Sequence, residues 1–356
     1  MRLAQELLRR GHEVAIFTRG AVAPHPEAPM VPVVGVPGRL PLMIAQRIRR
    51  ELDQFAPTDL IIQYTPQMFN AWRWGSAAVI GLALDARRKG VNVIVLAHEL
   101  FLSWQRRPDL IIGAALLRAQ FAALAAVANQ LFVTVEARAN YVAGWLRATR
   151  IKPDVGVVRI GSAALPAQRK SRSGGLHLGM FSTLAFGKRM DVVLECFRIV
   201  AAQRSDARLT LLGDLTSFGG ARLRQFEDAV AAHPARDRIR IPGKQDLSAI
   251  AQEVADFDVF LFPMDTGANT RSSTLPLALG SGLPVVATRG AETDDLFVDG
   301  ENIVLAEAMR GDAFATAIFR IVNDATMAER VSRGAQLLYE NHLSWQRIGD
   351  RLLAAV

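Results

Sequence analysis

The sequence contains one cysteine and few aromatic residues, and both shortages exclude classes of protein. Its 356 residues include 1 Cys, 3 Tyr and 5 Trp. A lone cysteine excludes an internal disulfide framework and suits a reducing compartment. Because Cys196 lies in the apolar stretch DVVLECFRIV, a buried core thiol is favoured over a nucleophile. The arginine clusters carry no aromatic residues in a stacking pattern, so a nucleic-acid partner is not expected.

Long hydrophobic runs are also missing. The most apolar stretch, Leu110–Val135, is interrupted by Arg118, Gln120 and Asn129, whereas a membrane-spanning helix needs about 20 consecutive apolar residues. We predict that this stretch forms a buried helix followed by a strand. The chain opens with the amphipathic, charged segment MRLAQELLRRGHEV rather than with a signal peptide. We therefore expect a cytoplasmic protein that is at most peripheral at the inner face of the membrane.

Common catalytic signatures are absent from the sequence as well. His98 is followed by Glu99, but residue 102 is Leu, so the zinc-binding HExxH spacing does not occur. The sequence has no G-x-S-x-G elbow, no Walker-type loop and no cluster of Cys and His residues. We expect neither a bound metal nor a cofactor.

Positive charge is concentrated in the first half of the chain. Residues 1–160 contain 20 Lys and Arg against 11 Asp and Glu, a net charge of +9, whereas residues 161–356 contain 22 against 23. Such a face could dock on an anionic membrane or attract an anionic acceptor, and solvated helix ends explain it equally well. The clusters are Arg9-Arg10, Arg47/Arg49/Arg50, Arg87-Arg88-Lys89 and Arg106-Arg107.

Short apolar runs alternate with amphipathic helical segments, which is typical of parallel α/β architecture. Between residues 157 and 175 the pattern breaks into VVRIGSAALPAQRKSRSGG and then restarts. This predicts two Rossmann-like domains, residues 1–160 and 176–340, joined by a linker at 161–175 and facing each other across a cleft. The predicted strands are Glu13–Thr18, Asp59–Tyr64, Asn92–Ala97, Gln130–Val135, Leu176–Phe181, Arg208–Leu212, Asp237–Ile241, Val259–Phe262 and Pro284–Thr288.

The start of the chain departs from this pattern. Leu3, Ala4 and Leu7 lie on one apolar face of an opening helix, which Gly11 closes. A doubly wound domain normally opens with a strand and a Gly-rich turn before its first helix. We therefore predict that the first sheet lacks its usual first strand and that the natural protein begins upstream of Met1. About 15–20 residues would supply the strand and the turn.

The most informative segment is DFDVFLFPMDTGANTRSSTLPLALGSGLPVVATRG, residues 256–290. A buried strand ends at Pro263, a polar loop follows, and an apolar helix begins near residues 272–274. The hydroxyl-rich run supplies N-cap side chains and free backbone N–H groups, and Arg271 adds positive charge beside the helix start. These features suit a diphosphate, although many capped helices bind nothing.

Two further strand ends carry candidate residues. In GMFSTLAFGKRMDVVLECF, residues 179–197, Lys188 follows a strand and could place its charge over a phosphate. A solvated loop lysine is the alternative. In VNVIVLAHELF, residues 91–101, a strand delivers His98 to its carboxyl end, where a lone histidine is more often structural than catalytic.

Taken together, these segments resemble the group 1, or family-four, glycosyltransferases of the GT-B fold over nearly the whole chain. The matching motifs are RGHEV at 10–14, AHE at 97–99, GKRMDVVLECF at 187–197, LLGD at 211–214, GLPVVAT at 282–288 and SWQRI at 344–348. The resemblance implies retaining transfer from a nucleotide-diphosphate sugar to a glycan, lipid-linked or small-molecule acceptor. The second domain would hold the donor and the first the acceptor, and residues 341–356 would form a helix that crosses back towards the first domain.

The resemblance also implies roles for individual residues. Lys188 would contact the diphosphate, and Arg271 would share the same anion site. His98 would approach the transferred sugar from the first domain. Asp214, Gly243 and Lys244 would lie near the nucleotide. The remaining diphosphate contacts would come from backbone groups at Ser272, Ser273 and Thr274.

The sequence differs from the family pattern at three positions. The family's usual pair of glutamates, eight positions apart, falls on Asn269 and Leu277. A leucine cannot hydrogen-bond a ribose, and the arginine usual before the lysine falls near Ser182 or Thr183, so Arg271 is inferred to replace its charge. A catalytically impaired GT-B-like partner protein therefore remains an alternative. A nucleotide-sugar epimerase is disfavoured, because the donor helix contains no acidic residue.

Overall fold

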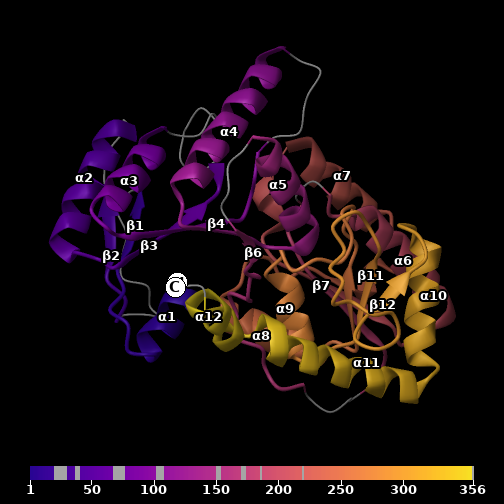
Figure 1. Cartoon of the computed structure of the whole chain (residues 1–356). Coiled ribbons are helices and arrows are strands. Elements are labelled where there is room, and N and C mark those ends of the chain that lie inside the picture. Colours follow the sequence, from indigo (N-terminus) through magenta and orange to yellow (C-terminus); the bar gives the residue numbers. More distant parts are fainter. Residues whose placement is uncertain are drawn as a thin grey trace. The chain divides into compact units, whose positions relative to one another are not determined.

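The chain folds into two compact units, each a Rossmann-like α/β domain (Figure 1). Unit 1 consists of Met1–Val158 and Ile348–Val356, and unit 2 of Arg159–Arg347. The α/β fold predicted from the alternating pattern is confirmed. The computed structural model describes residues 1–19, 30–36, 41–66, 77–101, 108–149, 154–169, 174–184, 187–218 and 220–354.

Unit 1 carries its strands in two parallel sheets. One sheet has the order β3-β4-β5-β6, and the other consists of β1 and β2. Within the described residues β1 pairs only with β2, and β3 only with β4. An upstream start of the natural protein stays a prediction. The elements of unit 1 are α1 (Arg2–Arg9), β1 (Ile16–Arg19), β2 (Val33–Val36), α2 (Pro41–Phe55), β3 (Asp59–Tyr64), α3 (Ala77–Arg88), β4 (Asn92–Ala97), α4 (Pro108–Val127), β5 (Gln130–Val133), α5 (Glu136–Ala148) and β6 (Val155–Val157).

Helix α4 corrects one expectation from the sequence. The apolar stretch does form a helix followed by a strand, but the helix is not wholly buried. Leu117 and Phe121 are fully buried, whereas Ile112 is 58% exposed and Leu116 is 50% exposed. The reason is that α4 packs on α3 and β4 along one side, while its apolar composition continues around the helix. Apolar side chains therefore face solvent.

Unit 2 is built on one six-stranded parallel sheet of order β12-β11-β10-β7-β8-β9. Its first strand, β7, lies in the interior of the sheet, as in doubly wound folds. The elements are β7 (His177–Phe181), α6 (Met190–Gln203), β8 (Arg208–Leu212), η2 (Leu215–Phe218), α7 (Gly220–Ala231), η3 (Arg236–Arg238), β9 (Ile239–Arg240), α8 (Leu247–Ala255), β10 (Val259–Phe262), α9 (Thr274–Gly280), β11 (Val285–Thr288), β12 (Val304–Ala306), α10 (Gly311–Val322), α11 (Ala325–Leu338) and η4 (Tyr339–Leu343), followed by α12 (Trp345–Leu353), which continues into unit 1.

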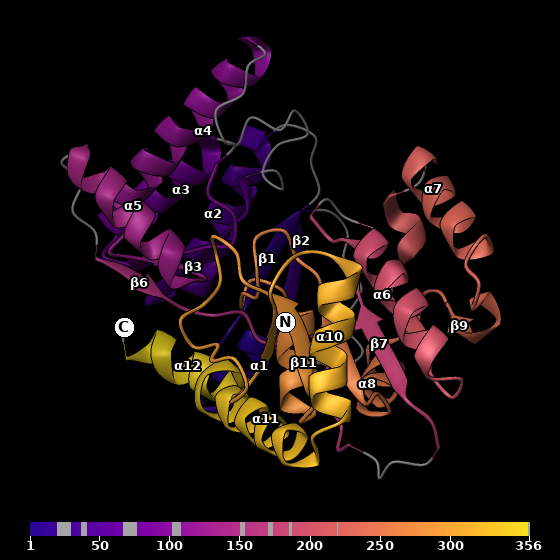
Figure 2. The ribbon, with the colours of Figure 1, turned by 90° about the vertical axis from the view of Figure 1, so that its right-hand side faces the viewer.

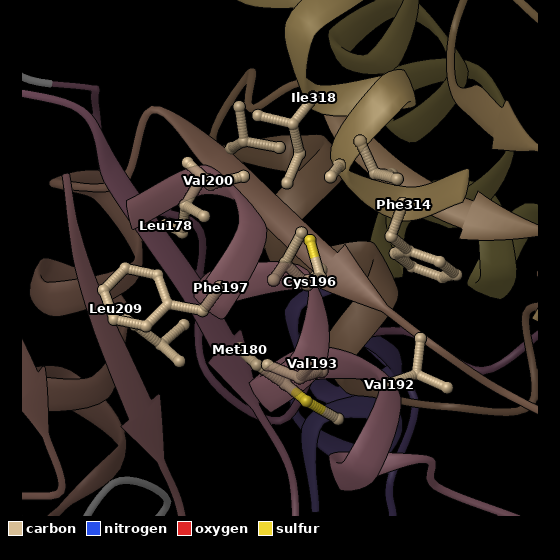
Figure 3. Close-up of a cluster of buried hydrophobic side chains, with 14 of the residues drawn as sticks. Leu178, Met180, Val192, Val193, Cys196, Phe197, Val200, Leu209, Phe314 and Ile318 are labelled. Atoms are coloured by element: carbon tan, nitrogen blue, oxygen red, sulfur yellow. The ribbon is translucent and has the colours of Figure 1, made fainter. Parts of the chain in front are cut away.

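Helices α6 and α10 pack side by side over the sheet of unit 2 (Figure 2). Cys196 and Phe197 of α6 meet Phe314 and Ile318 of α10 in a closed apolar cluster (Figure 3). Cys196 has no exposed surface, and burial raises the pKa of its thiol. The thiol is therefore a core group, as expected, and not a nucleophile.

Each predicted strand coincides with an observed one, although several are shorter than predicted and the first is displaced. The strand expected at Asp237–Ile241 is reduced to β9, because Arg236–Arg238 forms a 3₁₀ turn that leads into it. The strand expected at Glu13–Thr18 is β1, Ile16–Arg19. Three strands of three or four residues were not predicted, namely β2, β6 and β12. Such short runs hold too few residues to show a period.

Candidate functional site

The carboxyl ends of the parallel strands of unit 2 meet at one edge of the sheet. Strands β7 and β10 are neighbours there, although the chain runs from β7 to β8 on the other side. This reversal of strand order is the switch point at which open α/β sheets bind ligands. The loop after β7 carries Lys188, and the loop after β10 carries Arg271.

These two loops are hydrogen-bonded to each other. Lys188 forms an antiparallel bridge with Met264. The backbone N–H of Arg189 donates to Pro263 O at 3.0 Å, and the N–H of Asp265 donates to Gly187 O at 2.9 Å. The structure therefore holds Lys188 directly at the switch point, beside the start of the segment that the sequence singled out.

The ammonium of Lys188 is withdrawn from solvent. Burial lowers the pKa of Lys188. Among the described residues it makes no side-chain hydrogen bond or ion pair, whereas many of the arginines in these residues are paired with carboxylates. A half-buried cation without a protein counter-charge is a ready site for an anionic ligand.

Hydrogen bonds of Asn269 organise the loop after β10. Asn269 is 1% exposed. Its Nδ2 donates to Gly267 O at 2.9 Å and to Thr266 Oγ1 at 3.0 Å, while its Oδ1 accepts from the backbone N–H of Arg271 at 3.2 Å. Leu277 lies in α9 with no exposed surface. Asn269 therefore holds the backbone of this loop, and Leu277 packs in the core.

The following loop, after β11, is hydrogen-bonded to the loop after β10 and contributes residues that the sequence did not single out. Glu292 Oε2 accepts from Arg271 Nη1 at 2.5 Å, and its backbone N–H donates to Thr266 O at 2.9 Å. Asp294, whose side chain has no exposed surface, accepts from the N–H and hydroxyl of Thr270 at 2.9 and 2.6 Å. The only sequence signal for these two acids was the run ETDD, which has no diagnostic spacing.

The serine-rich start of α9 differs in detail from the prediction. The helix begins at Thr274 with Ser273 as its N-cap, but Ser273 makes no side-chain cap hydrogen bond, because its backbone is helical rather than extended. The hydroxyls of Ser272 and Thr274 lie 2.9 Å apart and bond to each other instead. The backbone N–H groups of the first turn have no partner within the helix.

Asp214, Gly243 and Lys244 lie at the same edge but on the other side of β7. Asp214 follows β8 and accepts from the N–H and hydroxyl of Thr216 at 3.1 and 2.7 Å, so it caps η2. Gly213 before it has φ 115°, and a side chain there would meet Ser182 O at 1.9 Å. Lys244 follows β9 and is exposed. Since strands are about 4.8 Å apart, β10 and β9 lie about 14 Å from each other, a span that suits an extended nucleotide.

His98 lies in unit 1, at the carboxyl end of β4. Its Nε2 is 2.5 Å from Gln63 Oε1 at the end of β3. Its backbone O accepts from Arg138 Nη1 at 3.0 Å, and Arg138 also pairs with Glu99 at 3.4 Å. Burial lowers the pKa of His98. The imidazole is therefore neutral near pH 7.

Several residues of the basic clusters in the first half form ion pairs with nearby carboxylates. Arg10 pairs with Glu6 and Asp350, both at 2.7 Å, and Lys89 pairs with Asp53 and Asp85. Arg49 pairs with Asp85 at 3.0 Å. Arg106 and Arg107 lie outside the described residues. In the part of the chain that the structure describes, no helix is both long and apolar enough to cross a membrane.

Comparisons with known proteins identify the family and the fold. Residues 1–155 match the sequence model "Glycosyltransferase Family 4", and residues 175–324 match "Glycosyl transferases group 1". No curated protein matches the sequence. The fold is similar to sucrose-phosphate synthase from Thermosynechococcus elongatus, with a TM-score of 0.73 and 16% identity over 100% of this chain and 92% of that one.

Two further solved structures are similar at comparable levels. A glycosyltransferase from Rickettsia africae has a TM-score of 0.74 and 14% identity, covering 99% of this chain and 92% of its own. HepE from Anabaena, solved in complex with UDP and glucose, has a TM-score of 0.72 and 14% identity, covering 99% of this chain and 94% of its own. At these identities the likeness shows the fold alone, which is GT-B.

Proposed function

Since the chain belongs to the group 1 and family-four glycosyltransferases, we propose that it transfers a sugar from a nucleotide-diphosphate donor to an acceptor hydroxyl. The bond between the anomeric carbon and the diphosphate oxygen breaks, and a bond to the acceptor oxygen forms. The acceptor proton and the nucleoside diphosphate leave. Transfer proceeds with retention, and the acceptor is a glycan, a lipid-linked sugar or a small molecule.

Lys188 is the observation that carries this proposal. It is a half-buried cation at the switch point of unit 2, and no hydrogen bond or ion pair joins its side chain to another described residue. A diphosphate supplies the missing negative charge, and its charge grows as the sugar leaves, so a fixed ammonium stabilises the transition state. Arg271 and the backbone at Ser272, Ser273 and Thr274 lie on the adjoining loop and complete the anion site. No metal or cofactor is required for this electrostatic role.

The rest of the carboxyl edge suits the nucleoside. Asp214, Gly243 and Lys244 follow β8 and β9, on the side of β7 away from the loop of Arg271. The complexes of HepE with UDP and with UDP-glucose support a uridine nucleotide as the first donor to test. Unit 2 is therefore the donor domain in this proposal. Unit 1 binds the acceptor, and His98 contacts the transferred sugar.

Asn269 and Leu277 favour one second candidate, a GT-B-like partner protein with impaired catalysis. Both replace family glutamates, and both are buried and used by the fold. Such a protein would bind a nucleotide sugar weakly or not at all and would not transfer it. In an active enzyme Arg271, which pairs with Glu292 at 2.5 Å, supplies the charge of the family's missing arginine, not the hydrogen bonds of the two glutamates.

The protein acts in the cytoplasm in this proposal, at the inner face of the membrane. The net charge of +9 in residues 1–160 and the exposed apolar side chains of α4, Ile111, Ile112 and Leu116, support contact with anionic lipid. If the acceptor is a lipid-linked sugar, the enzyme acts in the synthesis of cell-envelope polysaccharide. Nucleic acid is not a partner in this proposal.

A thermal-shift screen tests donor binding. UDP-glucose, GDP-mannose and ADP-glucose are added to the wild type, to Lys188→Ala and to the control Lys89→Ala, whose lysine is an exposed surface residue of unit 1. One donor at 100 times its dissociation constant stabilises the wild type and the control by about 2.7 kcal/mol, and Lys188→Ala loses most of this shift. Equal shifts in all three proteins contradict the placement of the diphosphate at Lys188.

A further inference from the structure

A hydrogen-bonded pair of polar side chains lies at the carboxyl ends of β3 and β4. The two strands are neighbours in the sheet of unit 1, with Gln63 opposite Leu96, so residues that follow β4 come close to the end of β3. Here His98 Nε2 lies 2.5 Å from Gln63 Oε1. Within the described residues, neither side chain makes another hydrogen bond.

The chemistry of the two groups decides the direction of this hydrogen bond. A carboxamide oxygen can only accept, so the imidazole nitrogen that faces it must carry a proton. A neutral imidazole holds one proton, and its other nitrogen then presents a lone pair. With the proton on Nε2, the acceptor of His98 is Nδ1.

The charged groups around His98 leave its ring neutral. Burial lowers the pKa of His98, and the neighbouring Glu99 opposes this shift only in part. Arg138, from α5, donates to His98 O and pairs with the carboxylate of Glu99. Within the described residues, the carboxylate of Glu99 is thus paired with Arg138. Gln63 contributes an acceptor without a charge.

We propose that Gln63 is a positioning residue that fixes His98 as the Nε2–H tautomer and leaves Nδ1 to accept a hydrogen bond from a sugar hydroxyl. The proposal rests on the proposed function, because it takes the hydroxyl to be that of the transferred sugar. It assigns His98 the role of a neutral acceptor and not of a cation that stabilises the diphosphate. A protonated ring donates from both nitrogens and cannot fill this role.

Two substitutions separate the effects of Gln63. Gln63→Glu keeps the oxygen acceptor and adds a negative charge, so it retains the Nε2–H tautomer and raises the pKa of His98 by about 1 unit or more. Gln63→Leu keeps similar bulk and removes the acceptor. Gln54→Leu is the matched control, because Gln54 is an exposed residue of α2.

The first measurement is nuclear magnetic resonance of the intact protein labelled with ¹⁵N-histidine, without any substrate. In the wild type and in Gln54→Leu, His98 shows a protonated Nε2 whose proton is protected from exchange with water. Gln63→Leu loses this protection, and Gln63→Glu keeps it while titrating at higher pH. A proton on Nδ1 in the wild type, or an unchanged Nε2 proton in Gln63→Leu, overturns the proposal.

The second measurement is the pH profile of sugar transfer. The acid limb of kcat/KM for Gln63→Glu moves about 1 pH unit upwards relative to the wild type, because protonation of His98 removes its acceptor. A purely structural role of Gln63 would lower the rate without moving the limb, and that result also overturns the proposal. Absence of sugar transfer would contradict the proposed function. It would not affect the magnetic resonance result, because that measurement uses neither a donor nor an acceptor.

Discussion

Lys188 is the residue on which the proposed anion site depends, and it lies at the switch point between β7 and β10. A lysine in the loop after a strand is a local pattern, so the sequence predicts its place. The places of Glu292 and Asp294 depend on distant residues. Their partners, Arg271 and Thr270, lie 21 and 24 residues earlier, and no local spacing encodes such a contact.

His177 gives a prediction of pH-dependent stability. It is 5% exposed, its Nε2 lies 2.9 Å from Thr210 Oγ1, and its Nδ1 lies 3.1 Å from Asp256 O. Burial, with the nearby charge of Arg208, lowers the pKa of His177 to about 4. The unfolded chain binds this proton below about pH 6.5. The contribution of neutral His177 to the free energy of unfolding is therefore fully present above about pH 6.5. It is lost as the pH falls towards 4.

The size of this effect is set by the difference between the two pKa values. About 2.5 units correspond to about 3 kcal/mol of unfolding free energy lost by pH 4. Urea denaturation between pH 7.5 and 4 measures it in the wild type and in His177→Gln, which cannot titrate. The variant should be less stable at pH 7 and lose less stability on acidification. Parallel curves for the two proteins would show that His177 is not the group responsible.

At the scale of elements, the sequence pattern predicted the interior strands of both units but not three of the short ones. Val259–Phe262 and Asn92–Ala97 are buried runs of β-branched and aromatic or aliphatic residues, and both were placed correctly. Strand β12, Val304–Ala306, depends on pairing with β11 for its conformation. The exposure of α4 was missed because an apolar helix has no polar face that would mark its solvent side.

The exposed side of α4 carries the prediction of membrane binding. The wild type should bind phosphatidylcholine vesicles more strongly as phosphatidylglycerol is added, and much less as salt shortens the Debye length from about 10 Å at 0.1 M to about 3 Å at 1 M. Leu116→Ser should weaken binding about tenfold, because burial of an apolar side chain in the interface contributes about 1.5 kcal/mol.

Leu337→Ser is the control for this experiment. Leu337 is also 50% exposed, but it lies on α11 in unit 2. Sedimentation of the three proteins with vesicles gives the bound fractions. The prediction is wrong if the wild type does not bind vesicles, if its binding does not depend on salt, or if both variants lose the same amount of binding. The basic residues of the first half are then an ordinary solvated surface.

For the whole molecule, the two-domain α/β fold was predictable because it rests on patterns repeated along the chain. The alternation of strands and helices occurs in both halves and restarts after a polar, Pro- and Gly-containing stretch. The site was predictable only as far as strand ends specify it. Tertiary packing determines side-chain networks such as the hydrogen bonds of Asn269 with Thr266 and Gly267. The residue types alone do not predict them, because the same types occur elsewhere without such a network.

The central claim is that this chain transfers sugar and that the anion site in unit 2 drives the reaction. The most direct measurement uses UDP-glucose, GDP-mannose and ADP-glucose, each labelled in the sugar, with a membrane-lipid extract and oligosaccharides as acceptors. For one donor the wild type and Arg198→Ala, a control at an exposed arginine of α6 in unit 2, should move label to an acceptor with retained anomeric configuration, also in excess EDTA. Lys188→Ala and Arg271→Ala should each lower turnover about 10²–10³-fold, as loss of a preorganised charge does. The account is contradicted if the wild type neither transfers the sugar of any donor nor hydrolyses it. It is also contradicted if Lys188→Ala and Arg271→Ala both turn over at the wild-type rate.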